Sequence, residues 1–231
     1  MDNLREILAT LLFQIGNPIT QYDQRGNLTS TLEGGGAIES AFPVLRFYTE
    51  FSDASKSVYS WNRSLPRSEE AFLSGRLAVY FGLASEIVPL RLKNPNLNFA
   101  VAEIPTPDDD VSRRKAVYSK LYGFAIPKSS PNPSGAFKAA LLLTESGPMR
   151  EFSRITNLAP VRRDLVTEPS DEVFMEVLKK QVIYAKTFLD PNPVRTEKLL
   201  ADMIGYITSG QRSIDDAIYV SSAEFDDLLA E

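Results

Sequence analysis

Residues 3–15 place their apolar side chains at helical spacing and therefore predict an amphipathic helix. Gly16 ends that helix, and Pro18 prevents it from resuming. Asn132 and Pro133 form a second clear helix start, in which an N-cap residue is followed by proline. Signals of the same kinds predict further helices at 38–51, 68–73, 85–92, 148–155, 171–186 and 193–208.

The end of the chain carries two capping boxes, in which a serine precedes an acidic residue by three positions. They predict two short final helices and consist of Ser213 with Asp216 and Ser221 with Glu224. In the helix that follows Asn132, we expect a buried stripe formed by Phe137, Ala140 and Leu141.

Alternating apolar residues predict short strands between the helices. The strands are expected at 77–81, 97–101 and 116–126, with a polar hairpin at 106–114 before the last of them. Because helices separate these strands, the pattern is typical of a helix-rich α/β fold. No internal repeat is visible.

Composition narrows the classes of function. The chain has 231 residues, 43% of them hydrophobic, which is enough for one large domain or two small ones. Its net charge of -5 argues against binding to nucleic acid or to an anionic membrane. The absence of cysteine and histidine excludes disulfides, thiolate nucleophiles, Ser-His-Asp triads and His- or Cys-ligated metals. Paired carboxylates, as in glycosidases, stay open.

The sequence contains no apolar run of the roughly 18 residues needed to span a bilayer. Asp2, Arg5 and Glu6 interrupt any apolar run near the start, so Met1 does not begin a signal peptide. Read literally, the chain is cytosolic. A shortened form of an exported protein would look the same.

Four segments carry recognisable motifs in a fixed order: residues 70–82, 99–105, 122–132 and 207–218. They resemble segments of family 1 extracellular solute-binding proteins, the sugar and oligosaccharide receptors of ABC importers. Residues 70–82 match the family's helix-to-strand turn, and residues 99–105 match a strand that ends in Ile-Pro. Residues 122–132 match the family's Ile-Pro-Lys segment before a helix, and residues 207–218 match its terminal Ser-Gly segment. Each match is weak alone, but together they indicate the family.

The resemblance implies a type II periplasmic-binding-protein-like second lobe plus a short return segment of the first lobe. On that interpretation residues 1–112 and 163–231 form the second lobe, and residues 113–162 belong to the first. Most of the first lobe would precede Met1 in a full-length protein. The strand at 116–126 would then lack its usual neighbours, so we expect a homodimer or a segment swap.

The implied function is non-enzymatic: a small solute, such as a sugar or oligosaccharide, is held in a cleft between lobes and passed to an ABC permease. The full-length protein would be extracellular or periplasmic and anchored to the membrane. No cofactor and no metal is expected. Residues 108–110 are consecutive aspartates at a hairpin tip, without the spacing of a cation site.

Sugars are held by aromatic faces and by planar polar side chains. Matched to the family's motifs, the turn after the strand at 77–81 should contribute Tyr80, Gly82 and Ser85 to the ligand site. The alternative is a core tyrosine, a turn glycine and an N-cap serine.

Further candidates lie elsewhere in the chain. Gln14 and Asn17 close the first helix, and Trp61 is a lone tryptophan in a polar loop. Phe188 and Asp190 occupy a segment where the family has an aromatic ligand loop, although phenylalanine replaces the frequent tryptophan. Their alternative roles are helix capping, loop anchoring and turn formation.

Two other functions stay open on the sequence. One is a carbohydrate-active hydrolase, which would need two close carboxylates, one with a raised pKa. The other is an interaction module that binds no small ligand.

Overall fold

The computed structural model describes residues 2–106 and 115–231. The chain divides into two compact units. The described residues of unit 1 fall within Met1–Gly82, Thr106–Tyr118 and Lys186–Glu231, and those of unit 2 within Leu83–Pro105 and Ser119–Ala185. The aspartates expected at a hairpin tip lie outside the described residues. The assignment of 1–112, 113–162 and 163–231 to two lobes stays a prediction.

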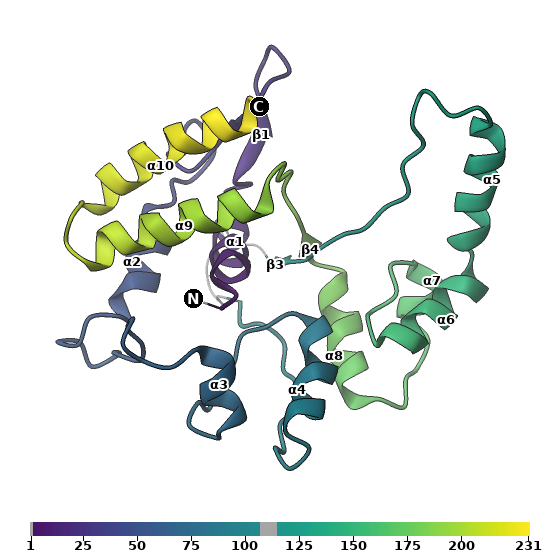
Figure 1. Ribbon diagram of the computed structural model, residues 1–231, viewed down its shortest axis with the longest axis horizontal. Coiled ribbons are helices and arrows are strands. Elements are labelled where there is room, and N and C mark those ends of the chain that lie inside the picture. Colours follow the sequence, from purple (N-terminus) through teal and green to yellow (C-terminus); the bar gives the residue numbers. More distant parts are fainter. Residues whose placement is uncertain (1, 107–114) are drawn as a thin grey trace. The chain divides into compact units, whose positions relative to one another are not determined.

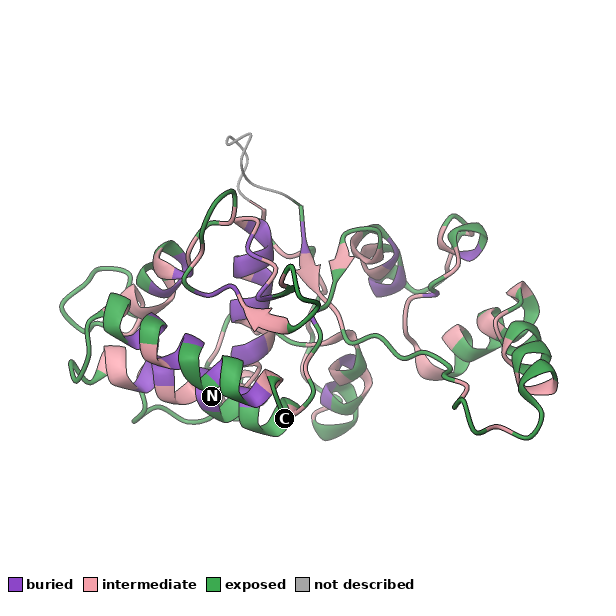
Figure 2. Ribbon diagram, turned by 90° about the horizontal axis from the view of Figure 1, so that it is seen from above, coloured by how far each residue is buried: buried purple, intermediate pink, exposed green. Residues whose placement is uncertain are grey.

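Helix α1 (Leu4–Gln14) lies in the core of unit 1. Leu4, Leu8 and Leu12 recur every four residues and are almost fully buried, so the predicted helix and its apolar face are confirmed. Helices α2 (Phe42–Glu50) and α9 (Pro193–Thr208) pack against α1, and α10 (Ile214–Leu229) packs against both of them. Figure 1 shows α9 and α10 side by side, and Figure 2 shows buried residues along α1.

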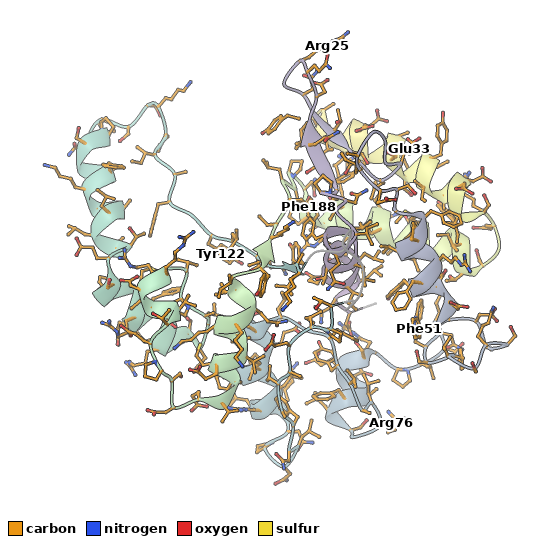
Figure 3. The ribbon with its side chains drawn as sticks, turned by 180° about the vertical axis from the view of Figure 1, so that it is seen from behind. Arg25, Glu33, Phe51, Arg76, Tyr122 and Phe188 are labelled. Atoms are coloured by element: carbon orange, nitrogen blue, oxygen red, sulfur yellow. The ribbon has the colours of Figure 1, made fainter. Side chains whose placement is uncertain are left out.

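Strands β1 (Thr20–Tyr22) and β2 (Leu28–Ser30) form an antiparallel hairpin directly after α1. Its turn is held by Asp23, whose Oδ1 accepts hydrogen bonds from the backbone N–H groups of Arg25 and Asn27, each at 2.8 Å. The bond from Asn27, reinforced by the one from Arg25, lowers the pKa of Asp23. The hairpin therefore projects from the core with Arg25 at its tip (Figure 3).

Two long helices complete unit 1. The Asn192 side chain accepts a hydrogen bond from the backbone N–H of Arg195 and caps α9, which spans the predicted residues 193–208. The Ser213 side chain caps α10 in the same way. The second predicted capping box is wrong, because α10 continues unbroken through Ser221, which is 2% exposed. No glycine or proline interrupts the helix there, and burial of its inner face favours continuity.

The predicted strands are mostly absent from the described residues. Residues 77–81 and 97–101 belong to no strand and no helix. Of residues 116–126, only β3 (Val117–Tyr118) is a strand, and it pairs with β4 (Ala185–Lys186). Alternation indicates which residues can form a strand, but a ladder also needs a neighbouring strand. Helix α3 (Ser68–Leu73) matches its prediction.

Unit 2 has a small core and little burial. Its helices are η1 (Ala84–Glu86), α4 (Ile87–Lys93), α5 (Pro133–Leu143), α6 (Ser146–Thr156), α7 (Arg163–Val166) and α8 (Val173–Val182). Ile87, Phe174 and Met175 form its buried cluster. Pro89 fits α4 because it lies in the first turn, where backbone N–H groups have no partner within the helix.

The stripe expected to be buried on α5 is exposed. Asn132 caps the helix as predicted, with its side chain accepting from the backbone N–H of Gly135. However, no residue of α5 is buried, and Phe137 and Leu141 are 57% and 51% exposed. Among the described residues, α6 is the main packing partner of α5, and the apolar face of α5 is exposed. Among the described residues, no helix is long and apolar enough to cross a membrane.

Candidate functional site

Unit 1 contains a pocket of about 600 Å³ where α1 ends and the β1–β2 hairpin begins. Gly16, with φ of +88°, turns the chain out of α1 in a conformation that favours glycine. The segment that follows β4 closes the opposite side. The lining residues are Phe13, Gly16, Asn17, Pro18, Thr20, Gln21, Tyr22, Leu28, Ala37, Ile38, Lys186, Thr187, Phe188 and Leu189.

Asn17 lines this pocket and is completely buried. Its Nδ2 donates to the backbone oxygens of Thr31 at 2.6 Å and Glu39 at 2.7 Å. Its Oδ1 accepts from the backbone N–H of Ile19 at 2.7 Å and from Oγ1 of Thr31 at 2.9 Å. The side-chain amide thus uses both N–H groups and both lone pairs inside the protein. Asn17 shapes the wall of the pocket.

The network around Asn17 holds a strained residue beside the pocket. Ile19 has φ of 70°, a left-handed conformation that β-branched residues rarely adopt. Such a conformation costs on the order of 1–3 kcal/mol and persists only where the surroundings enforce it. Ile19 is 3% exposed, donates to Asn17 and accepts from the backbone N–H of Thr31 at 2.9 Å. Strain of this kind gathers at functional sites.

Phe188 forms an aromatic wall of the pocket. It is 9% exposed, and its ring lies 6.1 Å from that of Tyr118 and 6.5 Å from that of Phe225, measured between centroids. The second contact is edge-to-face, with an interplanar angle of 82°. Core contacts therefore fix the ring, which also lines the pocket.

Four exposed residues of the pocket were not predicted from the sequence. Gln21, Tyr22, Lys186 and Thr187 line it and are exposed, with Tyr22 at 63%. Residues 19–36 looked like a polar connection, and Lys186 was assigned to a helix that instead ends at Val182. The one signal for a binding site in this part of the sequence was the aromatic residue Tyr22 between polar neighbours.

Gln14 and Asp190 make contacts within unit 1 and do not line the pocket. The Gln14 Nε2 donates to the backbone oxygen of Ala116 at 3.3 Å. The Asp190 carboxylate forms an ion pair with Arg5 at 3.2 Å and accepts from Oγ1 of Thr196 at 2.7 Å. Arg5 is only 7% exposed, so this pair fixes the segment after Phe188 against α1.

The remaining predicted residues also lie outside the pocket. Trp61 is partly buried against the core, with its ring 5.2 Å from that of Tyr48, and burial raises the pKa of Tyr48 to about 12. The Tyr80 hydroxyl accepts from Nδ2 of Asn3 at 2.9 Å. Gly82 is exposed at the end of unit 1, and Ser85 is exposed in η1 of unit 2. A ligand role for any predicted residue stays a prediction.

Acid–base groups are scarce at this pocket. No aspartate or glutamate is among the described residues that line it. The described residues also contain no group of three or more acidic side chains that could hold a metal ion. Elsewhere, hydrogen bonds from Arg162 and Ser146 lower the pKa of Asp164 to about 2, the opposite of what a general acid requires. The pocket offers shape, aromatic surface and hydrogen bonds.

Comparison with solved structures identifies the fold. The chain superimposes with a TM-score of 0.64 on a protein from Synechococcus sp. MITs9220 described as a candidate oligosaccharide periplasmic-binding protein, at 16% identity, covering 96% of this chain and 58% of that one. The chain has the fold of part of a periplasmic solute-binding protein. A zinc complex of the same Synechococcus protein gives a TM-score of 0.57 at 16% identity, covering 96% of this chain and 57% of that one.

An ABC transporter solute-binding protein from Thermotoga lettingae, bound with alpha-D-tagatose, also matches with a TM-score of 0.57. The identity is 16%, and the match covers 97% of this chain and 56% of that one. The chain thus spans less than two thirds of the length of these solute-binding proteins. No family model matches the sequence, and no curated protein matches it.

Proposed function

We propose that this chain is the solute-gripping part of a receptor for an ABC importer, and that the pocket of unit 1 is one wall of its carbohydrate site. The fold supports the proposal, because the structural neighbours are solute-binding proteins and one of them was crystallised with a sugar. Binding would be non-covalent and reversible. The partners would be a small solute and a permease, outside the cell or in the periplasm.

The observation that carries the proposal is the make-up of the pocket. Phe188 and Tyr22 offer aromatic surface that suits the C–H faces of a sugar ring. Gln21 and Thr187 offer exposed amide and hydroxyl groups that can bond sugar hydroxyls. Asn17 contributes shape rather than hydrogen bonds to a ligand, since its own amide is already satisfied within the protein.

Titration calorimetry with a panel of mono- and oligosaccharides tests the proposal. Replacing Tyr22 with alanine should weaken binding about threefold to tenfold, because an aromatic contact contributes about 0.5–1.5 kcal/mol. Tyr219→Ala is a matched control, since this tyrosine is 66% exposed on α10 and does not line the pocket. No sugar binding by the parent chain, or equal weakening by both variants, would overturn the proposal.

The hydrolase alternative gains no support from the pocket, because no carboxylate lines it among the described residues. The interaction-module alternative is favoured by one observation, the exposed apolar side chains of unit 2. The most exposed of these are Tyr122 at 92%, Val173 at 83% and Leu92 at 75%. A chain that associates with protein but binds no saccharide in the calorimetric panel would have this function instead.

A further inference from the structure

The pocket of unit 1 has an unbalanced charge. Lys186 is its one charged lining residue, it is exposed, and no carboxylate from the described residues lines the pocket beside it. This is unusual in a chain with 30 acidic and 25 basic residues. A positive group without a negative neighbour, placed at a concave surface, favours an anionic ligand.

The side chain of Lys186 has no partner among the described residues, whereas three other cations of unit 1 are paired. Arg5 pairs with Asp190 at 3.2 Å, and Arg195 and Lys198 pair with Glu231 and Asp202. The ammonium group of Lys186 therefore stays available to a ligand.

The end of α1 moderates this positive charge without cancelling it. A helix C-terminus carries roughly half a negative elementary charge from carbonyls that lack partners. At the end of α1, the backbone N–H groups of Ile15, Gly16 and Asn17 donate to the carbonyls of Leu11, Phe13 and Leu12. The remaining negative charge is smaller than the full positive charge of Lys186, so the pocket keeps an excess of positive charge.

The small excess of positive charge in the pocket fits a ligand with a single negative charge. Phosphate groups are dianionic near neutral pH, and proteins commonly bind them at helix N-termini or with several cationic side chains, among which arginine can bind two oxygens at once. This pocket has a helix C-terminus and no arginine. A carboxylate needs only one cation and a few hydrogen bonds, which Lys186, Gln21 and Thr187 can supply.

We propose that the solute of this pocket is an acidic sugar, a uronic acid or an oligosaccharide that carries one, whose carboxylate pairs with Lys186. The sugar ring lies against Tyr22 and Phe188. This inference rests on the proposed function and specifies its class of ligand.

The test measures binding of galactose, galacturonate and galactose 6-phosphate to the full chain by calorimetry and ligand-observed NMR. Galacturonate should bind about fivefold tighter than galactose, and the difference should shrink at high salt. Lys186→Met should abolish that preference, whereas Lys186→Arg should retain it. Lys56→Met is the control, because this substitution removes the same charge at a residue that does not line the pocket. The Lys56 side chain pairs with Glu50 at 3.5 Å.

The outcomes separate this inference from the proposed function. Equal binding of galactose and galacturonate, or a preference that survives Lys186→Met, overturns the acidic-sugar inference and leaves sugar binding intact. Tighter binding of galactose 6-phosphate than of galacturonate overturns the choice of a carboxylate. If none of these sugars and no member of the saccharide panel binds, the proposed function and the inference fall together.

Discussion

Asn17 shows how a residue can be singled out correctly and yet act differently from expectation. Its place at the end of the first helix marked it as a ligand contact, and it does line the pocket. The helix stop at Gly16 and Pro18 was readable from local sequence. The hydrogen bonds from the Asn17 amide to the backbone oxygens of Thr31 and Glu39 could not be predicted, because they depend on the hairpin folding back.

Replacing Asn17 with alanine should destabilise unit 1 by about 2–4 kcal/mol, because the buried backbone N–H of Ile19 and the buried hydroxyl of Thr31 lose the oxygen to which they donate. Asn27→Ala is the control: Asn27 is exposed on the same hairpin and donates to Asp23 at 3.2 Å. Chemical denaturation measures both free energies of unfolding. A loss below about 1 kcal/mol for Asn17→Ala would contradict the structural role assigned to its amide.

Helices were largely predictable because their signals are local, whereas strands were not. Caps and apolar spacing placed α1 and α9 within about a residue, since the hydrogen bonds of a helix lie within the segment. The strands expected at 77–81 and 97–101 depended on neighbours that the sequence does not specify. The apolar stripe of α5 does lie on a helix, as predicted. Its burial would need a second element packed against it, which the prediction assumed.

Two Asn-Pro helix starts provide a test at this scale. Asn192 caps α9, which carries core residues such as Met203 and Ile204, whereas Asn132 caps α5, which has no buried residue. Asn192→Ala should lower the stability of unit 1 by about 1 kcal/mol. Asn132→Ala should leave it unchanged and speed amide hydrogen exchange in α5 alone. Equal effects of both variants on the unfolding of unit 1 would refute this distinction.

At the scale of the whole molecule, the two units differ in how much apolar surface they bury. Unit 1 has a large core, but unit 2 leaves Leu121, Tyr122 and Phe124 exposed before α5, at 56%, 92% and 64%. Large exposed apolar patches mark surfaces that bind other proteins. The sequence resemblance predicted an unpaired strand at 116–126, whereas only Val117–Tyr118 is a strand and it pairs with β4.

We therefore expect the chain to self-associate through this surface. Sedimentation velocity should give a weight-average mass that rises with concentration, and the double substitution Tyr122→Ser with Phe124→Ser should reduce the rise. Tyr219→Ser, on the exposed face of α10, serves as the control. A monomer of 25.7 kDa at every concentration would rule out this association.

Unit 1 is proposed to bind a sugar in the pocket between the end of α1, the hairpin and residues 186–189. An NMR titration of the ¹⁵N-labelled chain with galactose and galacturonate tests it most directly. We expect the largest amide shifts on Gln21, Tyr22 and Thr187, with smaller changes elsewhere in unit 1. Shifts confined to unit 2, or none at saturating sugar, would contradict it.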